Sequence, residues 1–352
     1  MKDGTTLAAT IPFANRENAR SEGDQHQLEP RDAWMRPVSF FGLLRILRIV
    51  AGSPAGLRAS ELDEIIRSGG AYQTGNGRPS RTTLYPCRNT LLRLGALKRE
   101  GRRVTVERFD PLVAALLNEE QIDSLSSTAK EHLATLVLRN SDCRRHFFDL
   151  FMRGSSDYTL ADFRNRGRSV VWFWERPSPT GKRAVLEGSG GRSMALSFPS
   201  AIKGILYGIR YWARDQLGLI DEFFREERGF IMYPLRAFGE EEDPSRIAKQ
   251  MASLAPLGNR DWVELSVSDL KVQLCEKRGQ EVRSLLNAIR WLEAAYAGYV
   301  VLVPTSRAFA TLTASSANRE QLQLRGYFQD NQGRYISHIR LHNSVLSALK
   351  EA

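Results

Sequence analysis

An apolar stripe with helical spacing begins near residue 37. From Pro37 onward hydrophobic residues recur at every third position until Gly52, and this period predicts an amphipathic helix. The stripe consists of Val38, Phe41, Leu44, Leu47 and Val50. A second predicted helix begins at the capping residue Ser60 and ends at the Gly69-Gly70 pair. The pattern therefore predicts two consecutive helices at the start of a folded unit.

A third helix and a strand hairpin are predicted after a glycine-rich connection. The helix covers residues 81–95, and its inward face consists of Leu84, Cys87, Leu91 and Leu94. Thr83 is the expected N-cap, which places Pro86 in the first turn, where a missing N–H has little cost. Residues 96–109 then alternate as two strands with a turn at Gly101.

The middle of the chain changes from helical to strand-like periodicity. Residues 110–153 are predicted to be helical. Residues 169–199 predict strands, with a hairpin that turns at 176–181. Residues 201–227 predict a helix, and the apolar run 230–238 predicts a further strand. This mixture indicates a central α+β domain.

The last third of the chain repeats the pattern of its first third. The acidic run 240–243 marks a boundary, and Ser266 is the expected cap of a helix over 266–279. A longer helix is predicted over 281–298, followed by a strand hairpin over 299–313. The sequence therefore predicts a second unit of the same type.

The positive charge of the chain is concentrated in the first unit. The sequence has 352 residues, with 50 Lys and Arg against 40 Asp and Glu, a formal net charge of +10. Residues 35–108 contain 14 basic and 5 acidic side chains, a difference of +9. Residues 260–313 contain 7 and 6, a difference of +1. A basic excess in one unit is typical of a nucleic-acid-binding surface.

Cysteine usage and hydropathy indicate a cytoplasmic protein. The three cysteines are odd in number and far apart, so we expect no disulfide framework; they are Cys87, Cys143 and Cys275. The longest apolar runs, such as 299–303, are far shorter than the roughly 20 residues that span a bilayer. Residues 1–34 are polar and aperiodic, which predicts a disordered tail.

Three helices followed by a basic hairpin resemble the winged helix-turn-helix family of DNA-binding domains. The resemblance rests on the segment LLRLGALKREGRRVTVE at 91–107 and covers about 70 of the 352 residues. It implies an α+β fold with an N-terminal winged helix, a central mixed α+β domain and a C-terminal winged-helix-like unit. The expected divisions are a tail at 1–34, the winged helix at 35–109, a helical linker or packing region at 110–154, the central domain at 155–243 and the C-terminal domain at 244–352.

The resemblance implies that the third helix and the hairpin bind DNA. Asn89 and Arg93 lie on the predicted outward face, where Asn can pair bidentately with adenine and Arg with guanine. A solvated helix face is the alternative interpretation. The expected DNA-binding residues are Arg78, Arg81, Thr82, Tyr85, Arg88, Asn89, Arg93, Lys98, Arg99, Arg102 and Arg103.

Catalytic motifs are few. The glycine-rich run 188–191 lacks the lysine of a phosphate-binding loop, and we interpret it as a turn. Glu175, Glu187 and Lys182 form the one local set with the composition of a divalent-metal nuclease site. A solvated hairpin edge is the favoured interpretation of this set. The aromatic residues near 172–174 suit a core or a protein interface better than base stacking.

The sequence thus predicts a cytoplasmic, non-enzymatic protein that binds double-stranded DNA. Two roles fit: a DNA-recruiting subunit of a larger bacterial assembly, such as an antiviral defence or mobile-element system, and a transcriptional regulator. The alternatives are a metal-dependent nuclease that uses the central domain and a protein-interaction adaptor with tandem winged helices. No metal, cofactor or membrane is expected, and protein partners or self-association accompany the DNA.

Overall fold

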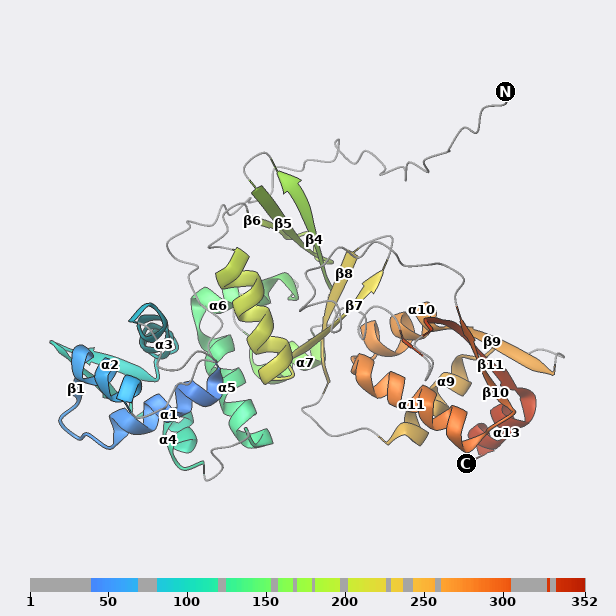
Figure 1. The fold of residues 1–352 in the computed structure, drawn as a ribbon, viewed down its shortest axis with the longest axis horizontal. Coiled ribbons are helices and arrows are strands. Elements are labelled where there is room, and N and C mark those ends of the chain that lie inside the picture. The colour runs from blue at the N-terminus through green and yellow to red at the C-terminus, as the bar shows by residue number, and fades with distance from the viewer. Residues whose placement is uncertain are drawn as a thin grey trace.

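The chain folds as a mixed α+β protein with three antiparallel sheets in the described ranges (Figure 1). The architecture comes from a computed structural model. The structure describes residues 39–68, 81–119, 125–152, 158–166, 170–178, 181–196, 202–225, 229–236, 243–256, 261–304, 328–329 and 334–351. The predicted tail at 1–34 lies outside these ranges.

The N-terminal unit packs helices against a three-stranded sheet. Its elements are α1 (Phe40–Ala51), β1 (Leu57–Arg58), α2 (Ala59–Ser68), α3 (Arg81–Arg93), β2 (Leu97–Glu100) and β3 (Arg103–Val106). The strands are ordered β1-β3-β2. The predicted stripe of α1 is confirmed at Leu44, Leu47 and Val50, which are buried. Phe40 is fully buried and Phe41 is half-buried, so the helix presents a wider apolar face than the spacing of three suggested.

The helical stretch predicted at 110–153 is confirmed. It contains α4 (Pro111–Leu117), α5 (Ser127–Arg139), α6 (Ser141–His146) and the short η1 (Phe148–Leu150), and α7 (Leu160–Arg166) follows. Side-chain caps begin three of these helices: Asp110 accepts from Leu112 N, Ser126 from Ala129 N and Asn140 from Cys143 N. These helices extend the core of the N-terminal unit toward the central sheet.

A five-stranded antiparallel sheet lies between the two smaller units (Figure 1). Its strands are β4 (Val171–Ser178), β5 (Gly181–Gly188), β6 (Ser193–Leu196), β7 (Ile220–Arg225) and β8 (Gly229–Pro234), ordered β6-β5-β4-β8-β7. The β4–β5 hairpin and the strand β8 are confirmed. Gly188 begins a tight turn into β6, with Gly191 N bonded to Gly188 O at 3.0 Å, so the glycine-rich run is a turn.

The predicted helix over 201–227 is wrong in its second half. The first half forms two π-helical stretches, η2 (Ile202–Ile209) and η3 (Tyr211–Gln216). The chain then turns at Gly218, which has a φ of +57°, and continues as the strand β7. The periodicity failed here because β7 is buried on both faces and has the charged Asp221 and Glu222 in its interior, so polar and apolar positions do not alternate along it.

Along β7 and β8 both faces of the central sheet are buried, each in a different hydrophobic core. Phe173, Leu186 and Met232 belong to the core that includes the N-terminal helices. Phe223, Ile231 and Tyr233 belong to the core of the C-terminal unit. The alternation of side chains along β7 and β8 thus connects one unit to each face.

The C-terminal unit contains a second three-stranded sheet. Its elements are α9 (Pro244–Leu254), β9 (Trp262–Ser266), α10 (Val267–Leu270) with its π-helical continuation η4 (Lys271–Glu276), α11 (Val282–Ala295), β10 (Val300–Pro304), β11 (Ile336–His342) and α13 (Asn343–Glu351). The predicted cap at Ser266 is confirmed, because its Oγ accepts from Asp269 N at 3.3 Å. The two units share one order of helices and strands, and β9-β11-β10 matches β1-β3-β2.

Of the hairpin predicted over 299–313, the structure describes the first strand, β10. β10 pairs with β11, so that Leu302 lies opposite Ile339 and Val300 opposite Leu341. Residues 305–313 lie outside the described ranges. The alternation of Ile339 and Leu341 with Arg340 is the sequence signal for β11, the described strand that pairs with β10.

The three cysteines are free and buried, which confirms that they form no disulfide framework. No helix in the described ranges combines the length and apolar character needed to cross a lipid bilayer.

Candidate nucleic-acid interface

The helix α3 presents one face to the core and another toward solvent. Cys87, Leu91 and Leu94 are buried, as the sequence predicted. Asn89 and Arg93 are half-buried and lie four residues apart, so they share a face of the helix. Asn140 Nδ2 donates to the Arg93 carbonyl and attaches the C-terminal end of α3 to the start of α6. The structure therefore positions two of the predicted base-reading side chains together.

Arg88 does not belong to this surface, and its predicted DNA contact is wrong. The residue is only 6% exposed. Its Nη1 donates to Asp63 Oδ1 at 2.8 Å and to the Ala59 carbonyl at 3.2 Å. Arg88 thus joins α3 to α2. Its partner is 25 residues away in the sequence, so the spacing of side chains along α3 gave no sign of this pairing.

Replacing Arg88 with alanine is expected to lower stability and leave any DNA sequence preference unchanged. The loss is about 1–3 kcal/mol, because the Asp63 carboxylate and a carbonyl lose their donor. Urea unfolding would measure it. Arg99→Ala is the matched control, since Arg99 is exposed and its removal is expected to change stability by less than about 0.5 kcal/mol. Equal midpoints for the two variants would contradict the structural role.

Four predicted contacts cannot be placed. Arg78 lies outside the described residues, and the side chains of Arg81, Thr82 and Tyr85 do too. The backbone shows that α3 begins at Arg81, so the expectation that Thr83 is the N-cap is wrong. Pro86 therefore lies beyond the first turn. The helix continues through this missing N–H because the following turns are buried in the core.

The β2–β3 hairpin carries exposed cations at its tip. Leu97, Val104 and Val106 are buried and fix its inner face. Gly101 forms the turn with a φ of +59°, a conformation that glycine adopts without strain. Arg99 and Arg102 are exposed, and neither makes a hydrogen bond or ion pair with another described residue.

The other two predicted hairpin cations have partners within the protein. Lys98 Nζ lies 3.1 Å from Glu100 Oε1 and 3.8 Å from Glu107 Oε2. Its hydrogen bond to Glu100, with the charges of both glutamates, raises the pKa of Lys98. Arg103 Nη1 donates to the carbonyls of Ala55 and Gly56, at 2.9 and 3.3 Å. Arg99 and Arg102 are thus the cations best placed to meet an external anion.

The sequence analysis missed Phe109, which follows the hairpin. Its side chain is 91% exposed, and Lys98 Nζ lies 6.0 Å from its ring centroid. An aromatic residue between a basic hairpin and the Asp110-Pro111 helix start was the available signal. A large exposed aromatic beside cations can stack on a base or enter a base step.

The candidate nuclease residues do not converge. In the β4–β5 register, position 187 pairs with Trp172 and position 175 pairs with Ala184. Successive strand positions alternate in direction, so positions 175 and 187 belong to opposite faces of the sheet. Among the described residues, no group of three or more His, Cys, Asp or Glu is placed to hold a metal ion. The aromatic residues Phe173 and Trp212 are buried in the core.

No protein family, curated protein or solved structure matches the chain. Its function is therefore argued from the geometry and charge of the α3 and hairpin residues.

Proposed function

We propose that the N-terminal unit is a winged helix that binds double-stranded DNA. In this proposal α3 enters the major groove and the β2–β3 hairpin is the wing. The observation that carries the proposal is the exposure of Arg99 and Arg102 on a hairpin next to the helix that bears Asn89 and Arg93. The order of three helices and three strands, with the hairpin last, supports the same assignment.

Phosphate contacts supply the sequence-independent part of the affinity. A guanidinium that pairs with a phosphate releases condensed counterions, and binding then weakens as salt rises. Arg99 and Arg102 are available for this role because they have no partner among the described residues. Lys98 contributes less, since Glu100 and Glu107 already neutralise it.

Base reading is assigned to the solvent side of α3. The amide of Asn89 suits the N6 and N7 groups of adenine, and the guanidinium of Arg93 suits the O6 and N7 groups of guanine. The buried Cys87, Leu91 and Leu94 hold the opposite side of the helix against α1 and the sheet. A helix fixed in this way presents its polar side in one orientation.

The C-terminal unit is not assigned to DNA, although its elements follow the same order. The helix that corresponds to α3 is α11, and its first amide, Val282 N, donates to Asp221 Oδ2 of β7 at 2.9 Å. The end of the helix that would enter a groove therefore packs on the central sheet. The near-neutral charge of residues 260–313 agrees with this, because phosphate binding needs excess cations.

Protein binding by the C-terminal unit is a second candidate function, favoured by its exposed apolar side chains. Trp262 is 38% exposed, Tyr299 53% and Val301 44%. The His342 ring lies between the two aromatic residues, with centroids 5.2 Å from Trp262 and 5.4 Å from Tyr299. Exposed apolar groups that gather in this way are typical of interaction sites. A unit that binds DNA and a unit that binds protein suit a DNA-recruiting subunit.

The wing assignment predicts a change in salt dependence. Replacing Arg99 and Arg102 together with alanine is expected to make the slope of log affinity against log salt shallower by about 1.8, because each lost phosphate contact removes about 0.9. Fluorescence anisotropy with a labelled duplex at several salt concentrations measures the slope. Arg183→Ala is the matched control, since it removes an exposed arginine from the distant strand β5.

Two results would contradict the proposal. If the intact protein does not shift duplex DNA at low salt, the proposed DNA-binding function is contradicted. If the double variant keeps the salt slope of the intact protein, the DNA-binding surface lies elsewhere on the protein. Adding Mg²⁺ to the same samples tests the alternative, because cleavage of the duplex would indicate a nuclease.

A further inference from the structure

One short segment caps helices in both outer units. Phe40 N, at the start of α1, donates to Gln216 Oε1 of η3 at 2.6 Å. Val282 N, at the start of α11, donates to Asp221 Oδ2 of β7 at 2.9 Å. The local N-cap residues of these helices make no side-chain capping hydrogen bond. A cap normally comes from the residue that precedes the helix, so both helices depend on a distant side chain.

The two caps join parts of the chain that are remote in sequence. Gln216 lies 176 residues from Phe40, and Asp221 lies 61 residues from Val282. Gln216 and Asp221 are close neighbours in the segment that runs from η3 into β7. Residues 210–222, which we call the connecting segment, thus touch the first helix of one unit and the third helix of the other.

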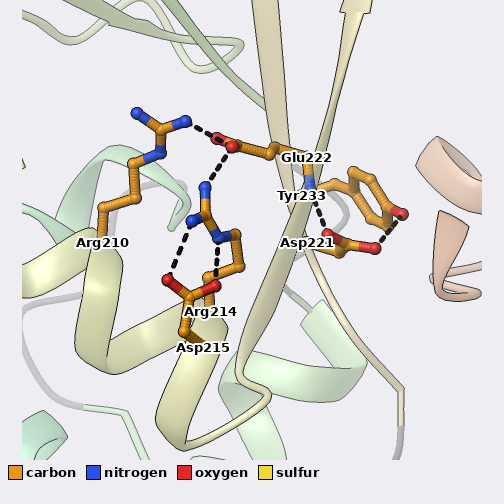
Figure 2. A network of polar contacts seen from close by, with 6 residues as sticks. All are labelled: Arg210, Arg214, Asp215, Asp221, Glu222 and Tyr233. Carbon is orange, nitrogen blue, oxygen red and sulfur yellow. Dashed lines mark hydrogen bonds and ion pairs between the residues drawn. The ribbon is translucent and has the colours of Figure 1, made fainter. Parts of the chain in front are cut away.

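A buried ion network fixes the connecting segment (Figure 2). Glu222 is fully buried, and its Oε1 accepts from both Arg210 Nη2 and Arg214 Nη1. Arg214 also makes a bidentate pair with Asp215, at 2.6 and 2.8 Å. The arginines lie on the helix and the glutamate on the strand, so the network holds η3 against β7.

The opposite side of β7 reaches the C-terminal unit. Figure 2 shows the Asp221 side chain on the opposite side of the strand from the Glu222 side chain, with its carboxylate directed toward Tyr233. Asp221 Oδ1 accepts from Glu222 N at 2.8 Å, and Tyr233 Oη donates to the Gln280 carbonyl at 2.8 Å. Adjacent residues of one strand therefore contact η3 on one side, through Glu222, and the C-terminal unit on the other, through Asp221.

Apolar contacts strengthen the connection at the α1 end. The rings of Phe40 and Trp212 have centroids 4.9 Å apart, and both residues are fully buried. Gln216 and Trp212 lie one turn apart on the same helix, so a displacement of α1 moves η3 with it.

We propose that the connecting segment couples the two units, so that duplex DNA bound at the N-terminal unit stabilises the first turn of α11. This inference rests on the proposed DNA-binding function. DNA that orders the N-terminal unit also orders α1, and α1 restrains η3 through Phe40. When η3 is restrained, Glu222 stays in place. The neighbouring Asp221 then caps α11 in a larger fraction of the molecules. Such coupling changes the opening of a distant helix without a new contact there.

Hydrogen exchange of the full-length protein tests the coupling, with a labelled duplex as the ligand. In the unaltered protein, a saturating duplex is expected to slow exchange in the first turn of α11 by about fivefold or more. Gln216→Ala is expected to reduce this slowing to less than about twofold. Gln216→Ala removes the cap on α1, whereas hydrogen exchange is measured at α11. Direct loss of the α11 cap therefore does not explain the expected change.

The reciprocal test replaces Asp221 and measures hydrogen exchange at the start of α1. Asp221→Ala is expected to speed exchange at the start of α1, and Asp221→Asn is expected to restore the original rate, since the amide oxygen can still accept from Val282 N. Asp215→Asn is the matched control, because Asp215 lies in the same segment and pairs with Arg214, beside the two capping residues Gln216 and Asp221. Its exchange pattern should equal that of the unaltered protein.

The outcomes separate the coupling from DNA binding. If the duplex binds and α11 exchange is unchanged, the coupling is overturned and the DNA-binding function stands. If no duplex binds, the DNA-binding function fails, and the variants without ligand still decide whether the ends of the segment are linked. If Asp221→Ala does not fold, Gln216→Ala and Asp221→Asn decide alone, and the proposal is overturned if duplex slows α11 exchange as much in Gln216→Ala as in the unaltered protein.

Discussion

Replacing Glu222 with alanine is expected to lower the free energy of unfolding by about 3–5 kcal/mol, because it leaves buried arginine charges without their counterion. Glu222 has no solvent exposure, and Arg210 and Arg214 both donate to it. Burial lowers the pKa of Arg214, but the charges of Glu222 and Asp215 outweigh this effect and raise its pKa overall. The Arg214 guanidinium therefore stays charged in the folded protein.

The surroundings of Arg210 leave it little alternative compensation. It is 9% exposed, and its guanidinium lies 5.6 Å from the ring centroids of both Phe173 and Phe230. Stacking on aromatic rings contributes about 0.5–2 kcal/mol, less than the cost of an uncompensated buried charge. The aromatic contacts of Arg210 therefore do not offset the free energy lost when Glu222 is removed.

Urea unfolding followed by circular dichroism measures this loss, and two further variants identify its cause. Asp215→Ala removes a more exposed carboxylate from the same network, so a loss below about 1 kcal/mol is expected. Methionine at Arg210, Arg214 and Glu222 together should recover most of the stability, because an apolar triad of similar volume needs no counterion. A triple variant as unstable as Glu222→Ala would show that packing, and not charge, is the cause.

Local periodicity was sufficient for the elements that bury a single face. The helices α1 and α3 and the hairpin β2–β3 follow the apolar spacing of Leu44, Leu91 and Val104, which are buried on one face of their elements. The strand β7 did not follow such a rule, because Ile220 and Phe223 enter different cores and the buried Asp221 and Glu222 lie between them. Two-faced burial removes the alternation on which a sequence-based strand prediction depends.

The charged residues show a similar limit. Arg99 and Arg102 could be recognised as surface cations from the sequence, because a turn with glycine places its neighbours in solvent. Arg88 has the same chemistry, yet it pairs with Asp63 of another helix. The sequence did hold one hint of the buried network: Arg210 and Arg214 lie four residues apart in an otherwise apolar stretch, where charges need an internal partner.

The α3 assignment predicts that specificity and stability are lost by different substitutions. Asn89→Ala and Arg93→Ala each remove a side chain able to form two hydrogen bonds to one base, so each is expected to reduce discrimination between the preferred and a scrambled duplex by about 1–3 kcal/mol. Leu91→Ala is expected to lower stability by about 2–5 kcal/mol instead, because Leu91 is 3% exposed and its loss leaves a cavity in the core.

The measurement begins with selection of a preferred site from random duplexes and continues with competition against scrambled DNA at fixed salt. Arg88→Ala now serves as the control, since its side chain pairs with Asp63 beneath the proposed surface. It should lose stability and keep specificity, the opposite of Arg93→Ala. If Asn89→Ala and Arg93→Ala both keep full specificity while the intact protein prefers one site, base reading belongs to another element. The first turns of α3 and the exposed Phe109 are then the next positions to replace, because they flank the same hairpin.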